Sequence, residues 1–196
     1  MTEFTILLAQ RRIHITALFE STRNYCKEYL CDGEADFSVV ISQEDIEFER
    51  RKSAAENELE GLPVIQFADR YLETLAVYRK IAEKMAEYDT ILFHGSVIAV
   101  DDEAFLFTAT SGTGKSTHTR FWRETFGDRA QMVNDDKPFL KITDEGIFAC
   151  GSPWSGKHGL DTNITVPLQG ICILERGKEN RIERIDPKEA LPMLLH

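Results

Sequence analysis

The sequence predicts an α/β protein in which a phosphate-binding loop lies near the middle of the 196-residue chain. Two observations carry this prediction. Extended and helical patterns alternate along the whole chain, and a glycine-rich loop separates an apolar, strand-like run from an amphipathic segment. The pattern changes near residue 90, so we expect an N-terminal α/β appendage over residues 1–89 and a phosphate-loop core over residues 90–196.

The composition narrows the class of protein further. Apolar residues make up 42% and charged residues 29% of the chain, as in an ordered globular protein. The net charge of −10 repels phosphate backbones and anionic lipids, so we expect neither a nucleic-acid partner nor a membrane surface. No apolar run approaches the roughly 18 residues of a membrane span, and Glu3 stands where a signal peptide carries positive charge. We expect a cytoplasmic protein with reduced cysteines, and a homo-oligomer is compatible with this composition.

Strands and helices alternate in the expected appendage. The β-rich runs are residues 4–9, 13–19 and 37–41. Ser21 is expected to cap a short helix that ends before Gly33. Ser42 and Asp45 form a capping-box pattern that opens a polar helix through about residue 59. An apolar stripe at helical spacing predicts the clearest helix over about residues 66–87, with its stripe packed on the core.

The alternation continues in the expected core. Its strands are predicted at residues 90–100, 104–108, 132–133, 139–142, 147–150 and 165–174, the last one broken by Pro167 and Gly170. Residues 101–103 form a turn, a helix runs from Lys115 to Phe126, and Pro187 opens a final helical stretch.

The strongest functional signal is the run from Ala109 to Ser116, A-T-S-G-T-G-K-S. It matches the phosphate-loop pattern G-x-x-x-x-G-K-[ST] at every fixed position except the first, where alanine replaces glycine. Small residues let backbone N–H groups surround a phosphate, and the following helix points its positive end at the same phosphate. Lys115 then reaches the β- and γ-phosphate oxygens, and Ser116 ligates Mg²⁺. The residues expected to bind the nucleotide are Ser111, Gly112, Thr113, Gly114, Lys115, Ser116 and Thr117.

The surroundings of this loop favour an anion. Residues 104–122 contain no acidic side chain, although the whole chain carries a net charge of −10. Lys115 and Arg120 therefore form a local region of positive potential. The alternative is a glycine-rich turn that binds nothing, and the preceding strand, the Lys-Ser pair and this charge distribution all speak against it.

Two adjacent carboxylates form the second signal. An Asn-Asp-Asp run at residues 134–136 follows an apolar pair, and nineteen residues separate Lys115 from Asp135. That length accommodates a three-turn helix, a turn and a returning strand, whose end then lies beside the phosphate loop. One carboxylate can hold Mg²⁺, for which we assign Asp135 together with Ser116, while Asp136 accepts a proton from an attacking hydroxyl. The two aspartate roles are interchangeable at this stage, and the alternative is an ordinary turn before the next proline.

His94 and a Gly/Ser-rich loop are weaker candidates. His94 ends an apolar run, where a lone histidine is usually a core residue. Beside the phosphate-loop strand, however, it can ligate a metal or tune the pKa of an aspartate. The loop over residues 151–159 carries Trp154 and Lys157, which suits a mobile segment that closes over an anionic substrate. The alternative for this segment is a plain connecting loop.

The run from Phe93 to Ile142 resembles the nucleotide-binding core that HPr kinase/phosphorylase shares with ATP-dependent phosphoenolpyruvate carboxykinase. The loop S-G-T-G-K-S over residues 111–116 is similar to the carboxykinase version. The pair Asp135-Asp136 resembles the aspartates that both families place on the next strand, and His94 stands where the kinase has His-Gly and carboxykinases have a metal-binding histidine. The resemblance covers roughly residues 91–176 and implies a mixed-sheet α/β core.

Two departures from the family pattern narrow what this resemblance implies. Residues 162–167 are similar to a carboxykinase T-R-x-x-Y-P segment, but Asn163 replaces the arginine that contacts the transferred phosphoryl group. The chain is also far shorter than a carboxykinase, and the signature that follows the core of HPr kinase is missing. The resemblance therefore implies a small protein related to HPr kinase whose phosphoryl acceptor need not be HPr.

We expect an ATP- and Mg²⁺-dependent kinase that transfers the γ-phosphoryl group to a hydroxyl of a protein, a peptide or a small molecule such as free serine. The expected catalytic residues are Asp135, Asp136, His94 and Lys115. Lys157 is expected to contact the substrate. One alternative is a nucleotide sensor without turnover, in which residues 1–89 engage a partner. The other is a carboxykinase-like lyase, against which Asn163 speaks. The acceptor and the choice between ATP and GTP stay open at this stage.

Overall fold

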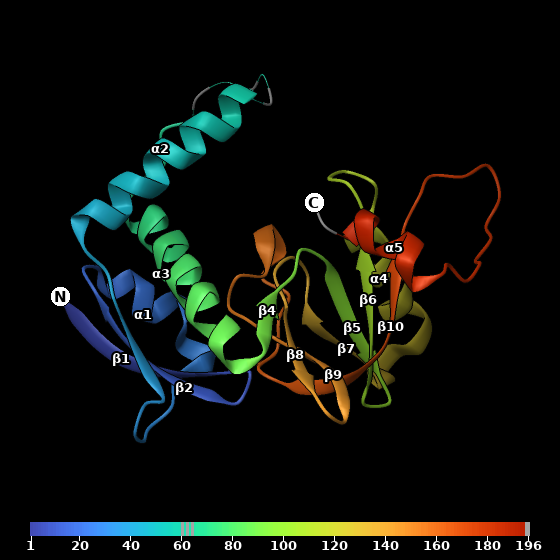
Figure 1. Cartoon of the computed structure of the whole chain (residues 1–196), viewed down its shortest axis with the longest axis horizontal. Helices are drawn as coiled ribbons and strands as arrows, with labels where there is room; N and C mark the ends of the chain where they lie inside the picture. The colour runs from blue at the N-terminus through green and yellow to red at the C-terminus, as the bar shows by residue number, and fades with distance from the viewer. Residues whose placement is uncertain (60, 62, 64, 195–196) are drawn as a thin grey trace.

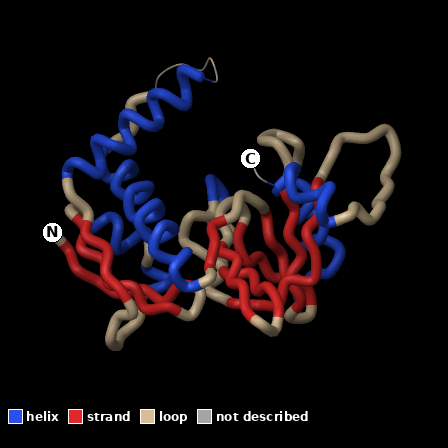
Figure 2. Tube along the Cα trace, viewed as in Figure 1, coloured by secondary structure: helices blue, strands red, loops and turns tan. Residues whose placement is uncertain are grey.

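Two sheets organise the chain in a computed structural model that describes residues 1–59, 61, 63 and 65–194 (Figure 1). A three-stranded sheet comes from the N-terminal part, and a seven-stranded sheet begins at residue 90. Each sheet contains both parallel and antiparallel strand pairs. Helices lie on the sheets as Figure 2 shows, so the protein belongs to the mixed α/β class that the sequence predicts.

The small sheet has the order β1-β2-β3. Its strands are β1 (Thr2–Leu8), β2 (Arg11–Ala17) and β3 (Phe37–Val40). Ala9 and Gln10 have φ angles of 47° and 65°, the left-handed conformation that a tight two-residue hairpin requires. Alternate side chains of β1 and β2 are buried, because successive residues of a strand point to opposite faces and one face packs on helices.

Helices α1 (Glu20–Tyr25) and α3 (Asp69–Met85) lie on the inner face of the small sheet with the short segment η1 (Lys27–Tyr29) (Figure 1). Helix α2 (Gln43–Leu59) packs on α3 and extends away from the sheet, and η2 (Ala86–Tyr88) follows α3. The capping interaction predicted for α2 is confirmed, because Ser42 N donates a 2.9 Å hydrogen bond to Asp45 Oδ2. Arg79 of α3 donates to Glu49 of α2 over 2.6 Å and ties these two helices together.

The prediction that Ser21 caps α1 is wrong. The helix begins at Glu20, and no side chain within the segment caps it. The buried carboxylate of Glu73 in α3 takes this role instead, since it accepts hydrogen bonds from Leu18 N at 2.5 Å and from Phe19 N at 3.2 Å. The Thr22 hydroxyl also donates to it. A distant residue therefore satisfies the backbone groups that a local cap normally serves.

The large sheet has the order β4-β8-β9-β10-β6-β5-β7. Its strands are β4 (Thr90–Leu92), β5 (Ser96–Val100), β6 (Glu103–Thr108), β7 (Ala130–Asn134), β8 (Phe139–Thr143), β9 (Gly146–Cys150) and β10 (Thr165–Ile173). The helical segments of this part are α4 (Lys115–Phe126), η3 (Gly127–Arg129), η4 (Gly156–His158) and α5 (Pro187–Leu194). The predicted bounds of α4 are confirmed, and α4 packs Trp122 on Phe105 and Phe107 of β6. Residues 195–196 of the predicted final helical stretch lie outside the described residues.

The single strand predicted over residues 90–100 is in fact two strands. β4 pairs with β8 at one edge of the sheet, whereas β5 lies between β6 and β7. Between them, Phe93 N donates to Pro138 O and Gly95 N donates to Asp136 O, each over 3.0 Å. A Cβ at Gly95 would lie 3.1 Å from the Phe107 carbonyl oxygen, so the crossing point is closely packed and favours glycine. The apolar sequence gives no sign of this change of partner.

The sequence predicts a strand over residues 165–174 that is broken by Pro167 and Gly170, and the structure has a register shift there instead of a break. β10 is one continuous strand, but it pairs antiparallel with β9 over Thr165–Pro167 and parallel with β6 from Leu168 onward. The register shifts between Leu168 and Gly170. A bulge of this kind lets one strand bend from one partner to the next without ending.

The two sheets meet in a shared hydrophobic core. One cluster joins the buried faces of β1, β2 and α3 to Phe139, Cys150 and Trp154, which belong to the larger sheet and its loops. Trp154 Nε1 donates a 2.9 Å hydrogen bond to the Thr74 carbonyl oxygen inside this cluster. The boundary that the sequence predicts near residue 89 therefore separates two sheets but not two separate cores. None of the helices in the described residues is both long and apolar enough to cross a membrane.

Candidate functional site

The strand order brings the predicted motifs to one edge of the large sheet. β6 and β7 both pair antiparallel with β5, so their carboxyl ends and the start of β5 lie side by side. β6 leads into the phosphate loop, β7 leads into Asp135 and Asp136, and His94 precedes β5. His94 itself lies in the crossing between β4 and β5, and the strand that it precedes, β5, neighbours the phosphate-loop strand β6.

The phosphate loop spans residues 109–114 between β6 and α4. Gly112 and Gly114 have φ angles of 76° and 121°, which L-residues with a side chain rarely adopt. Lys115 opens α4, and its ammonium group donates a 3.1 Å hydrogen bond to the Ala109 carbonyl oxygen across the loop. The loop, the amino end of α4 and this ammonium group therefore face a common space, an arrangement that favours a phosphate.

Asp135 is held in one orientation at the end of β7. Its side chain is buried, with a residue exposure of 6%, and Ser96 Oγ donates a 2.7 Å hydrogen bond to its Oδ1. The same Ser96 oxygen lies 3.0 Å from Thr119 Oγ1 in α4, one turn after Ser116. This chain of hydroxyl groups fixes Asp135 relative to the helix that carries Ser116. The sequence assigns no role to Ser96 and Thr119, because their contacts join residues 23 and 39 positions apart and no local pattern marks them.

Asp136 is half-buried and lies beside a histidine and a lysine. His94 Nε2 lies 3.3 Å from its Oδ1, and Lys137 Nζ lies 3.7 Å from its Oδ2. Burial raises the pKa of Asp136, but the hydrogen bond with His94 and the positive charges of Lys137 and Lys115 together lower it by more. The net pKa is below the ordinary value, so Asp136 is ionised at neutral pH, as a proton acceptor must be.

Asn134 shapes the turn that carries the two aspartates. Its side-chain oxygen accepts hydrogen bonds from Asp136 N at 2.8 Å and from Lys137 N at 2.6 Å. Its amide nitrogen donates a 2.8 Å hydrogen bond to the Ser152 carbonyl oxygen. The buried asparagine therefore joins the aspartate turn to the loop after β9, a role that the sequence run alone does not reveal.

The loop after β9 differs from its prediction. Trp154 is 4% exposed and packs against Tyr78, with 5.3 Å between the ring centroids, so its indole does not face a ligand. Gly151 is also enclosed, because a Cβ there would lie 1.9 Å from the Thr162 carbonyl oxygen. The first half of the loop is therefore anchored in the core, which corrects the expectation of a segment that is mobile throughout. Lys157 lies in the exposed turn η4, where its predicted contact with the substrate stays a prediction.

Gly156, in the loop after β9, lies against Asp136, whereas Asn163, further along the chain, bonds to β1. A Cβ built on Gly156 would lie 3.2 Å from Asp136 Cβ, so the exposed turn passes directly over the aspartate. Asn163 instead points away from the phosphate loop, and its Nδ2 donates a 3.2 Å hydrogen bond to the Leu7 carbonyl oxygen of β1. Asn163 therefore takes no part in the site that the other motifs form.

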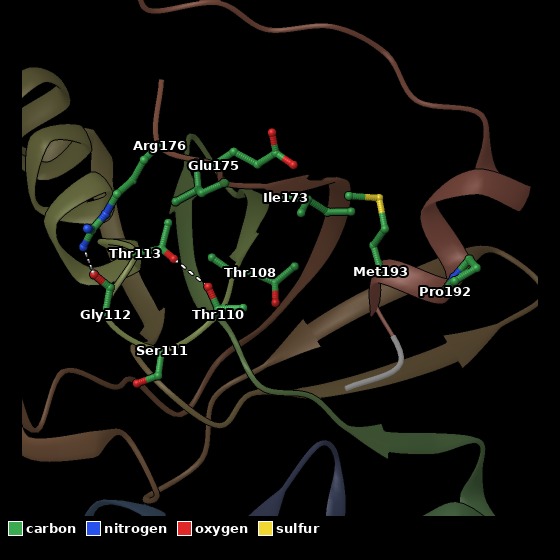
Figure 3. A pocket seen from close by; sticks show the side chains of 12 residues that line it. Thr108, Thr110, Ser111, Gly112, Thr113, Ile173, Glu175, Arg176, Pro192 and Met193 are labelled. Carbon is green, nitrogen blue, oxygen red and sulfur yellow. Dashed lines mark hydrogen bonds between the residues drawn. The ribbon is translucent and has the colours of Figure 1, made fainter. Parts of the chain in front are cut away.

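A cavity of about 680 Å³ opens beside the phosphate loop (Figure 3). Its walls come from residues 108–113, from residues 173–176 after β10, and from Pro192 and Met193 of α5. Arg176 donates a 2.7 Å hydrogen bond to the Gly112 carbonyl oxygen and closes one side. The mixture of hydroxyl groups with Ile173 and Met193 gives a partly apolar cleft of the size that organic ligands occupy.

The residues at this edge suit Mg²⁺ held jointly with a phosphate. Within the described residues, no three His, Cys, Asp or Glu side chains gather into a cluster that could hold a metal ion alone. Mg²⁺ commonly takes one or two protein oxygens and completes its shell with phosphate oxygens and water, and Ser116 and Asp135 are the oxygen donors that could take this part. No family model matches the chain, and no curated protein matches it.

Proposed function

We propose that the protein is an ATP- and Mg²⁺-dependent phosphotransferase related to HPr kinase, which transfers the γ-phosphoryl group to a hydroxyl. The observation that carries this proposal is the meeting of the phosphate loop, the aspartate pair and His94 at one sheet edge, with Ser96 bonded to Asp135 and within hydrogen-bond distance of Thr119 in α4. Phosphoryl transfer needs positioning and charge neutralisation more than covalent help, and these groups supply both. The resemblance of residues 93–142 to the HPr kinase core supports the same reaction.

Each group has one task in this proposal. The loop amides and Lys115 bind the β- and γ-phosphates, and Ser116 with Asp135 holds Mg²⁺. The metal, when bound, neutralises charge on the phosphate oxygens. Asp136 accepts the proton of the acceptor hydroxyl while the hydroxyl oxygen bonds to the γ-phosphorus and the bond to the ADP oxygen breaks. His94 positions Asp136 through the 3.3 Å contact.

The cavity of Figure 3 receives the nucleoside half of ATP in this proposal. It adjoins residues 110–113 of the phosphate loop, so a triphosphate held by the loop leaves its ribose and base on that side. Ile173 and Met193 provide apolar contact area for a base, and Thr108 and Thr110 provide hydroxyl groups. A volume of about 680 Å³ accommodates a nucleoside.

The test compares two site variants with two surface variants. Lys115→Ala should weaken ATP binding, whereas Asp136→Asn should retain binding and lower the turnover of γ-labelled ATP by about a hundredfold or more. Lys84→Ala and Asp128→Asn remove equivalent charges from exposed positions and serve as controls. Turnover like that of the wild type in both site variants would overturn the proposal. Tight ATP binding by the wild type, with no labelled product in lysate of the source cells, would favour a nucleotide sensor instead.

A further inference from the structure

A second, smaller cavity lies between the N-terminal part and the loop after β9. Its volume is about 260 Å³. Tyr25, Lys27 and Glu28 line it from the N-terminal side. Ser155, Gly156 and Asp161 line it from the loop. The cavity therefore exists only because residues 1–89 fold against the phosphate-loop core.

The cavity adjoins Asp136. A Cβ on Gly156, which lines the cavity, would lie 3.2 Å from Asp136 Cβ and 3.8 Å from its Oδ2. Tyr25 also lines the cavity, and burial first, then Cys26, Asp161, Tyr71 and last Asp136 raise the pKa of Tyr25 to about 12. His94 and Lys137 also flank Asp136, at 3.3 Å and 3.7 Å, and the charge of Lys115 on the phosphate-loop side lowers the pKa of Asp136. Asp136 thus stands between the phosphate loop and the cavity.

Hydrogen bonds between the residues that line the cavity hold its walls in place. Tyr29 donates a 2.9 Å hydrogen bond to Asp161 Oδ2, and Ser155 Oγ donates to Asp161 Oδ1. The neighbouring Trp154 is anchored to Thr74 of α3. A binding site whose walls are already ordered loses little entropy when a ligand enters.

We propose that this cavity binds the phosphoryl acceptor and that the acceptor is a small zwitterionic hydroxy compound of amino-acid size. The inference rests on the proposed function and names its substrate class. Both signs of charge line the cavity. Lys27 and Glu28 form an exposed ion pair at 3.7 Å, and a zwitterion can replace it by pairing its carboxylate with Lys27 and its ammonium group with Glu28 or Asp161. The partly exposed Tyr25 ring offers a face for the same cation. A volume of about 260 Å³ lies below the range of typical organic-ligand sites, which matches an acceptor of few atoms.

Binding is tested first without nucleotide. ¹H–¹⁵N spectra of the full chain are recorded during titration with L-serine, with ethanolamine, which lacks the carboxylate, and with glycerate, which lacks the ammonium group. L-serine should shift the amide signals of Gly156 and Gly159 and should bind more tightly than either of the other two compounds. Unchanged signals at L-serine concentrations far above millimolar would overturn the proposal. Equal affinity for all three compounds would overturn it as well.

Transfer is tested second, with a matched pair of charge variants. Lys27→Met and Glu28→Gln should each raise the KM for L-serine by about fivefold and leave the KM for ATP near the wild-type value. Lys52→Met and Glu56→Gln alter a similarly spaced, exposed ion pair in α2, at 3.9 Å, and should leave both KM values unchanged. Equal KM values for L-serine in both pairs would overturn the cavity as the acceptor site. Transfer exclusively to a peptide or protein would overturn the small acceptor.

The two proposals fail in distinguishable ways. A wild-type protein that does not bind ATP contradicts the proposed function, whereas the titration with L-serine judges the cavity independently of any nucleotide. A wild-type protein that consumes ATP without any response to L-serine contradicts the acceptor assignment and leaves the phosphate loop in place.

Discussion

The hydroxyl of Tyr29 donates a 2.9 Å hydrogen bond to Oδ2 of Asp161, across the junction between the N-terminal part and the large sheet. Tyr29 is fully buried there, next to Cys26, and Asp161 follows the turn that passes over Asp136. A single buried phenol therefore links the stability of this junction to the position of the candidate acceptor site.

Replacing this phenol should change how stability depends on pH. Burial, reinforced by Asp161, raises the pKa of Tyr29 far above its ordinary value of 10.0, so the folded protein keeps the phenol protonated while the unfolded chain ionises above about pH 10. The stability that this group contributes is present below pH 10 and is lost above it, by about 1.4 kcal/mol per pH unit. Tyr29→Phe should cost about 1 kcal/mol at pH 7 and should remove this part of the alkaline slope. Urea unfolding between pH 7 and 11 under reducing conditions measures both effects. If the free energy of unfolding falls equally with pH in the wild type and in Tyr29→Phe, Tyr29 does not cause the alkaline slope.

Removing the charge of Glu73 should destabilise the fold. Its buried carboxylate accepts hydrogen bonds from Leu18 N, Phe19 N and the Thr22 hydroxyl, and a glutamine would turn an N–H group toward one of these donors. Glu73→Gln should lower the free energy of unfolding by about 2 kcal/mol. Glu83→Gln, which alters an exposed partner of Arg79, should change it by less than about 0.5 kcal/mol. Equal unfolding midpoints in urea for the two variants would show that Glu73 does not hold α1.

Removing the Ser96 hydroxyl should weaken the metal site. Ser96 bonds to Asp135 and lies 3.0 Å from Thr119 Oγ1, so Ser96→Ala leaves Asp135 free to turn away from Ser116. We expect the Mg²⁺ concentration for half-maximal ATP turnover to rise about tenfold. Thr90→Val removes another buried hydroxyl, one that bonds to the Tyr88 carbonyl oxygen at the far edge of the sheet. The same Mg²⁺ requirement in both variants would argue against Asp135 as the ligand.

Replacing His94 should move the acidic limb of the pH–rate profile. Burial raises the pKa of Asp136 and His94 acts against it, so His94→Gln should raise this pKa toward its ordinary value. Asp136 accepts a proton only while it is ionised, so kcat/KM should begin to fall at a higher pH than in the wild type. His14→Gln, in β2, serves as the control. An identical acidic limb in both variants would separate His94 from the titration of Asp136.

Adding one methyl group at Gly156 should disturb catalysis more than stability. Gly156 has a φ of 71°, and its new Cβ would lie 3.2 Å from Asp136 Cβ. Gly127 has a φ of 56° and no atom within 4 Å of its Cβ position, so Gly127→Ala carries the strain without the contact. Both variants should lose about 1 kcal/mol of stability, but Gly156→Ala alone should lower turnover by about tenfold or more. Equal turnover would show that the turn does not press on Asp136.

Local signals in the sequence predict part of this structure well. The bounds of α4 at Lys115 and Phe126 are confirmed, because the glycine-rich loop and an amphipathic pattern lie next to each other along the chain. The capping contact between Ser42 and Asp45 is confirmed for the same reason, since three residues separate the partners. The meeting of Lys115, Asp135 and Asp136 at one edge follows from the length of the helical connection.

The remaining features depend on partners that are distant in sequence. Residues 90–100 carry no breaker strong enough to show that β4 and β5 lie in different parts of the sheet, and the exchange of partners becomes visible only in the contact of Gly95 with Asp136. A tryptophan such as Trp154 suits either a ligand cleft or a core. The hydrogen bond from Trp154 to Thr74 of α3 places it in the core. The roles of Glu73 and Ser96 arise from contacts across the fold, so no local pattern marks them.

The hydrophobic cluster that runs from β1 and α3 to Phe139 and Trp154 determines how this protein can be dissected. Cutting the chain at Asp89 would expose one half of this apolar cluster on each fragment, and each fragment would aggregate when expressed alone. Produced together, the same fragments bury that surface again, so activity should return by complementation. The smallest unit to study is therefore the pair of fragments, and residues 90–196 alone are the wrong starting point for biochemistry.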